Sequence, residues 1–413
     1  MRWPDALTPL RDKRFAWYYT GRFISTVGST MAPIALTFAV LDLTGDSPSA
    51  LGKVLAANSV PLVVFLLVGG VIADRFSRSL VLQVSHLLSS LTQAAVATLI
   101  LTGTAELWMV VVLEAINGTV VAFTFPAMYG VVPQVVPRQY LQQANALLSF
   151  SRGGLAIIGP SIAAILVVTV GPGWALAIDA CTWFIAAGCM RLVRIPARER
   201  SEDVPPNMIR ELREGWSAFV GNTWVWVVVV AFGVLNMIHA GAWFTLAPAI
   251  AKKTIGEDGW GLVLSAEALG LLVMTVLMLR VKFRHPLRAG MLGCAVFSVP
   301  LLTMGLDPQL LPLVGTAFLS GVGMEIFGIG WNTSLQEHIP EQVLSRVSSY
   351  DALGSFVAIP IGQLVYGPLA VIFDAKTVLT VSGIVYATVA IGTLLSPSVR
   401  NLERSRTTET VHV

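Results

Sequence analysis

The sequence predicts an all-α membrane protein, with twelve transmembrane helices arranged in two six-helix bundles. Its composition is 55% hydrophobic and only 12% charged, whereas an ordinary soluble domain has about 25% charged residues. Apolar runs of roughly 20 residues recur along the whole chain, and a helix of that length crosses the hydrocarbon core of a bilayer. A membrane β-barrel is excluded, because stretches such as Trp224–Val230 are continuously apolar where barrel strands alternate.

The apolar runs place six spans on each side of one long connection. The first six are expected at residues 15–41, 49–73, 79–102, 107–130, 141–168 and 174–193. The second six are expected at residues 223–250, 260–280, 288–305, 309–332, 346–372 and 376–396. The predicted organisation is an N-terminal bundle (1–195), a linker (196–220), a C-terminal bundle (221–396) and a tail (397–413).

The connection itself has two parts. Residues 208–220 are amphipathic at helical spacing, which predicts an interfacial helix. Residues 196–207 are equally consistent with a disordered linker. The N-terminus does not resemble a cleavable signal, because its polar residues run directly into the first span.

Positive charge indicates the side of the membrane on which the termini lie. An even number of spans places both ends on one side, and 21 of the 27 Lys and Arg residues lie in the termini and loops of that side. The opposite loops contain four, Lys53, Lys252, Lys253 and Lys376. Because cytoplasmic loops are enriched in Lys and Arg, we expect cytoplasmic termini.

A short internal repeat favours two related halves. Residues 134–141 read QVVPRQYL and residues 337–344 read EHIPEQVL, with three identities in eight positions. The similarity is weak alone, but it occurs after the fourth and the tenth span, which are equivalent places in two six-span halves.

The turn at residues 70–82 reads GVIADRFSRSLVL and concentrates an acid and two arginines between two apolar spans. Such a turn belongs at the membrane surface. Its position and pattern resemble the loop motif of the major facilitator superfamily, although Ser77 replaces a usual glycine and Ser79 a usual basic residue. The residues that match are Gly70, Asp74, Arg75 and Arg78.

This charged turn is expected to act as a gate. Asp74 can accept hydrogen bonds from arginines or from a helix N-terminus and so hold the cytoplasmic side shut. The alternative is an anchoring turn at the lipid headgroups. The corresponding loop of the second half, residues 280–286, keeps the positive charge but has no acid.

A second resemblance narrows the group. Residues 123–137 (FTFPAMYGVVPQVVP) and 143–149 (QANALLS) resemble the helix 4–5 region of bacterial efflux carriers, the group of the enterobactin exporter and the macrolide and tetracycline pumps. Gly154, Gly159 and Pro160 resemble the helix 5 motif of drug/proton antiporters. The resemblance implies export, with helix 5 meeting the second half of the chain; ordinary tight helix packing is the alternative.

We single out six of the charged residues inside the predicted spans, where each is costly unless it faces water or a partner. A buried carboxylate can bind and release a proton near neutral pH, as proton coupling requires. Glu267 and Glu114 are the leading candidates for that role, followed by Asp179. Permanent ion pairs between helices are the alternative. The six are Arg22, Glu114, Arg152, Asp179, Glu267 and Glu325.

Four further residues are candidates for a substrate cavity: Asn236, His239, Trp243 and Asn332. Helix–helix hydrogen bonds and core packing explain such residues equally well. Catalytic motifs are absent: the sequence has no phosphate-binding loop with Lys, no Ser/His/Asp arrangement and no His/Cys metal spacing. We therefore expect no enzyme activity, no cofactor and no metal.

The interpretation is a secondary active transporter of the bacterial inner membrane that exports an amphipathic or hydrophobic small molecule, such as a drug, a siderophore or a secondary metabolite. Proton antiport with alternating access is the expected mechanism. The expected partners are the small-molecule substrate, protons and the lipid bilayer, with a monomeric chain and no nucleic acid. An uncoupled facilitator or lipid flippase is the alternative, and a membrane receptor or enzyme on the same fold is a remote one.

Overall fold

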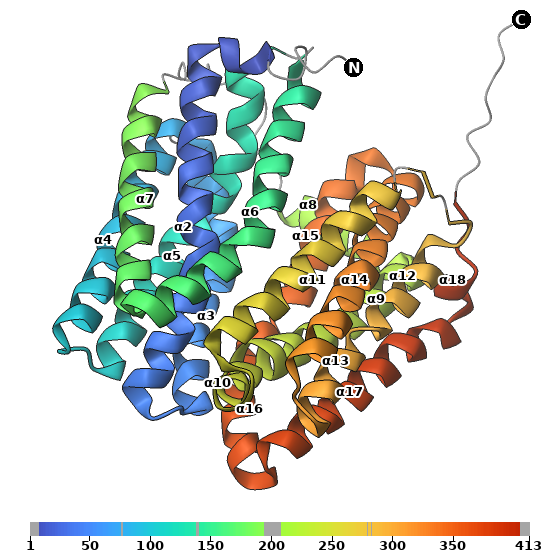
Figure 1. Cartoon of the computed structure of the whole chain (residues 1–413). Helices are drawn as coiled ribbons and strands as arrows, with labels where there is room; N and C mark the ends of the chain where they lie inside the picture. Colours follow the sequence, from blue (N-terminus) through green and yellow to red (C-terminus); the bar gives the residue numbers. More distant parts are fainter. Residues whose placement is uncertain are drawn as a thin grey trace, which may run out of the picture. The chain divides into compact units, whose positions relative to one another are not determined.

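The computed structural model describes residues 8–75, 77–137, 140–193, 208–278, 280–281 and 283–404. Within these residues every secondary-structure element is helical (Figure 1), and twelve helices are long and apolar enough to cross a membrane. The prediction of an all-α protein with twelve transmembrane helices is confirmed. The predicted disordered linker at 196–207 lies outside the described residues.

The chain packs as two compact units. Unit 1 comprises Met1–Glu202, Phe244–Ser265 and Gln363–Ile372; unit 2 comprises Asp203–Trp243, Ala266–Gly362 and Phe373–Val413. Unit 1 therefore contains the first six spans together with two segments from the second half of the sequence. The expected bundles are continuous stretches of sequence, whereas these units are defined by packing and combine separate stretches. The boundaries expected from sequence therefore stay a prediction.

The first six spans of unit 1 are long helices that end at glycines or at short turns. Asp12 begins the first span by accepting a hydrogen bond from the backbone N–H of Arg14 at 2.8 Å, and Gly45 ends it with φ of 64°, the left-handed conformation that glycine adopts at low cost. The helices are α2 (Lys13–Thr44), α3 (Pro48–Arg75), α4 (Arg78–Thr102), α5 (Leu107–Val135), α6 (Leu141–Val170) and α7 (Pro172–Leu192), preceded by η1 (Thr8–Arg11).

These helices pack closely in pairs. The largest contacts are α3 with α5, α4 with α7, and α2 with α7. Gly118 of α5 faces the backbone of Asn58 on α3, and a Cβ at this position would come 2.9 Å from the Cα of Asn58. Glycine is required there because the two backbones touch.

The remaining spans run through both units. The seventh is built from α9 (Thr223–Ile238), the π-helical η3 (His239–Leu246) and α10 (Ala247–Thr254). The others are formed by α11 (Gly256–Met278), α12 (Pro286–Ala295) with α13 (Ser298–Leu306), α14 (Leu310–His338), α15 (Glu341–Phe356) with α16 (Ile359–Phe373), and α17 (Ala375–Gly392) with η4 (Thr393–Leu395).

Two short helices of unit 2 flank these spans. Residues 208–221 form α8 (Met208–Gly221), which packs against α15 and α9. Trp216 on α8 stacks on Phe219 and meets the edge of Tyr350, with ring centroids 5.6 and 5.4 Å apart. After α18 (Pro397–Arg400), Glu403 pairs with Arg284 at 2.8 Å. The start of the tail is thus held against the loop that follows α11.

The internal repeat has a structural counterpart. The backbone N–H of Tyr140 donates to the carbonyl of Pro137 at 2.9 Å, and that of Val343 donates to Pro340 at 3.0 Å. The two prolines occupy equivalent positions in the repeated segment, so the same turn leads into α6 and into α15.

Large apolar side chains are exposed along the spans. Leu311 is 83% exposed, Val371 81% and Phe150 77%. Exposure of this kind is costly in water and ordinary against lipid, which agrees with a multi-pass membrane protein.

Candidate functional site

Unit 1 contains a buried polar cluster around Glu114 on α5. The Glu114 side chain is 2% exposed, and its Oε2 accepts a hydrogen bond from Nδ2 of Asn58 on α3 at 2.9 Å. Its Oε1 has no hydrogen-bond partner within the described part of the chain. The close approach of α3 at Gly118, one turn along α5, brings Asn58 within reach of this carboxylate.

Asp179 on α7 belongs to the same region. It is 1% exposed, and neither carboxylate oxygen has a hydrogen-bond partner among the described residues. Asp179 lies against α2, where a Cβ on Gly28 would come 2.9 Å from the Cα of Asp179. The described residues form no ion pair with either acid, and burial of such a pair is tolerated when a proton neutralises the charge.

Glu267 and Trp243, which are predicted separately from the sequence, are partners in unit 2. The Nε1–H of the buried Trp243 donates to Oε2 of the half-buried Glu267 at 3.1 Å. His239, one turn before Trp243, packs edge-on against Phe297 with ring centroids 4.6 Å apart. Glu325 lies on α14, where Oε1 accepts from Oγ1 of Thr275 at 2.7 Å.

The two asparagines among the cavity candidates have structural partners. Asn236 on α9 donates from Nδ2 to the carbonyl of Ser355 on α15 at 3.0 Å, so it joins two helices. Asn332 donates to the carbonyl of Gly328 in its own helix at 2.8 Å. These contacts agree with the alternative that polar residues in spans form hydrogen bonds within and between helices.

Arg22 and Arg152 line one cavity of unit 1, although 130 positions separate them in the sequence. The cavity has a volume of about 300 Å³ and lies among α2, α5 and α6. Beside the arginines, the Tyr19 hydroxyl and the Ser151 hydroxyl are hydrogen-bonded at 2.6 Å, which ties α2 to α6 at the cavity wall.

The charged turn is described in part. Gly70, Asp74 and Arg75 belong to the last turns of α3, but their side chains lie outside the described residues, and Arg78 begins α4. Ser79 has a defined role: its hydroxyl lies 3.0 Å from the carbonyl of Met190 and 2.7 Å from that of Val193. One of the two residues that depart from the loop motif therefore caps the end of α7.

The helix 5 motif forms a close contact with a segment from the second half of the sequence. A Cβ on Gly261 of α11 would lie 2.9 Å from the carbonyl oxygen of Pro160. Next to it, the hydroxyls of Ser161 and Ser265 are hydrogen-bonded at 2.8 Å. Gly159 packs against Thr30 of α2, whereas a Cβ on Gly154 would meet nothing within 4 Å.

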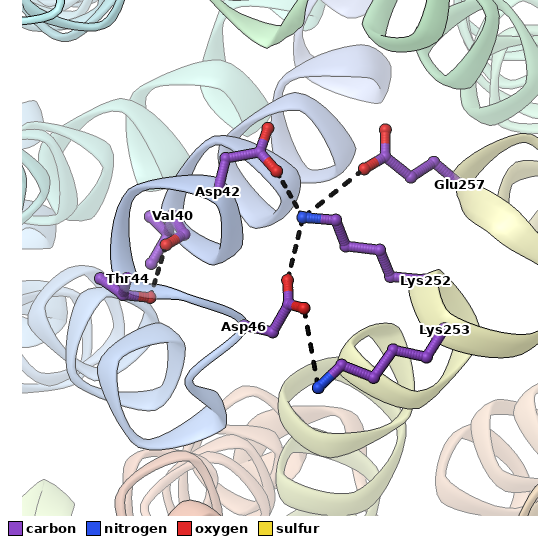
Figure 2. Close-up of polar contacts among 7 residues, drawn as sticks. All are labelled: Val40, Asp42, Thr44, Asp46, Lys252, Lys253 and Glu257. Atoms are coloured by element: carbon purple, nitrogen blue, oxygen red, sulfur yellow. Dashed lines mark hydrogen bonds and ion pairs between the residues drawn. The ribbon is translucent and has the colours of Figure 1, made fainter.

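A group of ion pairs lies at the end of α2 farthest from the N-terminus (Figure 2). We call Asp42, Asp46, Lys252, Lys253 and Glu257 the Lys252 cluster. The Lys252 ammonium contacts Asp42, lies 2.9 Å from Oδ1 of Asp46 and 3.9 Å from Oε1 of Glu257. Lys253 pairs with Oδ2 of Asp46 at 3.6 Å. All five residues belong to unit 1.

Asp46 is the acid of this cluster that pairs with both lysines. It follows Gly45 in the α2–α3 turn and has φ of 62°, an uncommon backbone conformation that Asp tolerates better than most residues. The hydrogen bond from Lys252 is the largest influence on Asp46 and holds the pKa of its carboxyl below the usual value. From sequence alone the two lysines are recognisable only as loop charges, and their acidic partners are not predicted. The only signal in the sequence for this pairing is that the lysines and the acids lie at or next to loops predicted on the same side of the membrane.

The sequence also matches a known family. Residues 18–362 match the profile of the Major Facilitator Superfamily, which is most of the chain. The chain belongs to the major facilitator superfamily. The family and the fold are those of transporters rather than enzymes.

Two relatives of this superfamily protein are exporters by name. Macrolide efflux protein A of Streptococcus pyogenes is 25% identical over 358 residues, which cover 85% of this chain and 88% of the relative. Enterobactin exporter EntS of Escherichia coli O1:K1 / APEC is 24% identical over 406 residues, with 95% and 94% covered. Among solved structures, the nucleoside transporter NupG aligns with a TM-score of 0.73 at 14% identity, covering 92% of this chain and 98% of its own. That likeness supports the fold alone.

Proposed function

We propose that this superfamily member is a proton-driven exporter of an amphipathic or hydrophobic small molecule that works by alternating access. The observation that carries the proposal is the pair of buried acids, Glu114 and Asp179, with three carboxylate oxygens that have no partner within the described residues. A site that binds a proton in one conformation and releases it in another supplies the coupling that antiport requires. The two exporters among the relatives support the direction of transport.

The Lys252 cluster supports a gate on the side opposite the termini. Asp42 and Asp46 lie at the end of α2 and in the α2–α3 turn, whereas the two lysines lie at the end of the seventh span and Glu257 in the first turn of α11. The cluster therefore joins segments from both halves of the sequence. We propose that these ion pairs hold the non-cytoplasmic side shut and separate when that side opens. Asp74 and the arginines of the charged turn are proposed to do the same on the cytoplasmic side.

Transport in everted membrane vesicles tests the function. A panel of amphipathic dyes and antibiotics is offered with an imposed proton gradient, and uptake into the everted vesicles is followed with and without a protonophore. We expect uptake of at least one compound that the protonophore abolishes. Undiminished transport after collapse of the gradient would identify an uncoupled facilitator or a lipid flippase and reject antiport.

The membrane and its topology are part of the proposal. We propose that the protein is a monomer in the bacterial inner membrane with both termini in the cytoplasm, as the distribution of Lys and Arg favours. Reporter fusions at the C-terminus and within the 194–222 connection test this orientation. Periplasmic activity of either fusion would contradict it.

A further inference from the structure

We call the cavity of unit 1 that Arg22 and Arg152 line the arginine cavity. Its lining has an unusual chemical composition. Of its titratable side chains, two are guanidinium groups, Arg22 and Arg152, and no acid is present among the described residues that line it. Arg152 lies 11 residues after the start of α6 at Leu141, or about 16 Å along the helix at 1.5 Å per residue. At that depth a guanidinium that faces hydrocarbon is strongly disfavoured, so it requires water or an anion.

Arg152 has no acidic partner in the part of the chain that the structure describes. Its side chain is exposed at the edge of the cavity. The charge is therefore available to an incoming ligand.

Four of the five hydroxyl groups of the lining are already occupied as donors. Ser151 donates to the carbonyl of Leu147 at 3.0 Å, which leaves Tyr19 as the donor in its 2.6 Å bond to Ser151. Thr26 donates to the carbonyl of Arg22 at 2.7 Å, and Tyr18 donates to that of Met128 at 3.3 Å. Beside the neutral groups of Asn145 and Ser149, the Arg152 guanidinium is a charged donor at the cavity. A guanidinium selects an acceptor with negative charge.

The rest of the lining is mainly apolar, with Asn145 and Ser149 as the remaining polar residues. Tyr19 stacks on Phe23 with ring centroids 6.3 Å apart and planes inclined by 28°. Met128, Val132 and Leu148 complete this side. A volume of about 300 Å³ lies at the lower end of the range for small-molecule sites, which suits a body of one or two rings.

We infer that this cavity binds an organic anion in which a carboxylate or a similar oxyanion is attached to an apolar ring. The arginines hold the anionic group, and the wall formed by Tyr19, Phe23 and the aliphatic residues holds the ring. This inference rests on the proposed function, because it names the chemical class of the exported substrate.

A matched pair of probes separates charge from apolar contact. Naphthoate and naphthamide share one ring system, but only naphthoate is an anion at neutral pH. Binding of each probe to the purified full-length protein in phosphatidylcholine nanodiscs is measured by equilibrium dialysis, with empty nanodiscs subtracted. We expect naphthoate to bind about ten-fold or more tightly than naphthamide, the effect of a charge-assisted hydrogen bond.

Variants assign the effect to the cavity. Arg152→Gln and Arg22→Gln are each expected to lower naphthoate binding by about ten-fold and to leave naphthamide binding unchanged. Arg191→Gln, which removes the same charge from an exposed position at the end of α7, is the matched control and is expected to bind naphthoate normally. Equal binding of the two probes, or naphthoate binding that survives both cavity substitutions, would overturn the inference.

Two further measurements distinguish a lipid headgroup from a small-molecule ligand, and failure of export from failure of binding. Adding phosphatidylglycerol to the nanodiscs tests for a lipid headgroup as the occupant: loss of naphthoate binding, dependent on Arg152, would overturn the assignment to a small-molecule substrate. The dialysis needs no proton gradient. Failure of gradient-driven export would therefore reject the proposed function while anion binding is still observed, and failure of binding would reject only the substrate class.

Discussion

The ammonium of Lys252 lies 2.9 Å from Oδ1 of Asp46, although 206 positions of sequence separate the two residues. Lys252 also contacts Asp42, and Lys253 reaches the second oxygen of Asp46. A network in which one lysine serves two acids is stronger than an isolated surface pair, whose contribution is about 0–1 kcal/mol. The contact brings the end of the first span and the end of the seventh span together.

Breaking this network is expected to open the non-cytoplasmic side more often. Lys252→Met removes the shared cation and leaves Asp42 and Asp46 facing each other, so we expect labelling of a cysteine placed at position 49, beside the turn, to rise several-fold. Lys376→Met, which removes an exposed lysine from another loop of the same predicted side, is the control. Equal labelling in the two variants would show that the cluster does not restrict access.

The Lys252–Asp46 pair is also expected to show a defined pH dependence. The pKa of Asp46 is held below its ordinary value by the hydrogen bond from Lys252, so the stabilisation is complete above the unfolded-state pKa of about 3.9. It is lost as pH falls through the lower folded-state pKa. The difference in melting temperature between the wild type and Asp46→Asn should be constant near neutral pH and should vanish in acid; a difference that disappears between pH 6 and 8 would contradict this.

Glu114→Gln is expected to abolish proton coupling without unfolding the protein. Glutamine keeps an oxygen that can accept from Asn58, so the 2.9 Å hydrogen bond is retained while the ionisable group is removed. We expect gradient-driven export to fall about ten-fold or more, with a melting temperature close to that of the wild type. Glu106→Gln, at the exposed start of α5 where Glu106 bonds Trp108, is the control; full export by Glu114→Gln and Asp179→Asn together would reject the assignment.

Gly261→Ala is expected to destabilise the contact with the helix 5 motif. The added methyl would lie 2.9 Å from the carbonyl oxygen of Pro160, and overpacking of this kind costs about 1–3 kcal/mol. Gly154→Ala is the matched control, because a methyl there meets nothing within 4 Å and alanine favours the helix by about 0.5–1 kcal/mol. Thermal unfolding in detergent should rank Gly261→Ala below the wild type and Gly154→Ala level with it or above it.

Ser79→Ala is expected to loosen the end of α7. The hydroxyl lies within hydrogen-bond distance of the carbonyls of Met190 and Val193, and loss of such a bond costs about 0.5–1.5 kcal/mol. Ser59→Ala removes a hydroxyl that bonds only within its own helix, to Leu55, and serves as the control with little expected change. Equal melting temperatures for the two variants would indicate that the cap contributes nothing.

The spans were predictable from sequence because membrane crossing depends on local composition. A run of about 20 apolar residues is sufficient to form a spanning helix, since lipid offers no partner to an unsatisfied backbone group. The charged turn at residues 70–82 was found for the same reason, because its charges interrupt two such runs. The six intramembrane charges were likewise identified by their cost, which needs no knowledge of neighbours.

The partners of those charges were not predictable. Glu267 and Trp243 were singled out independently, and only the packing of α11 against η3 makes them a hydrogen-bonded pair. Asn236 and Asn332 were cavity candidates, yet both amides bond to backbone carbonyls of helices. Hydropathy records how polar a residue is and carries no information on the direction of its side chain around the helix.

The sequence by itself determined that this protein is a twelve-span helical transporter of the major facilitator superfamily, because span length, charge placement and the loop motif are local properties of the chain. Only the tertiary structure decided that Lys252 meets Asp46 and that Arg22 and Arg152 line one cavity. These relationships depend on helix rotation and on crossings between segments more than a hundred residues apart. The close packing of Gly261 against the backbone of Pro160 is a crossing of this kind.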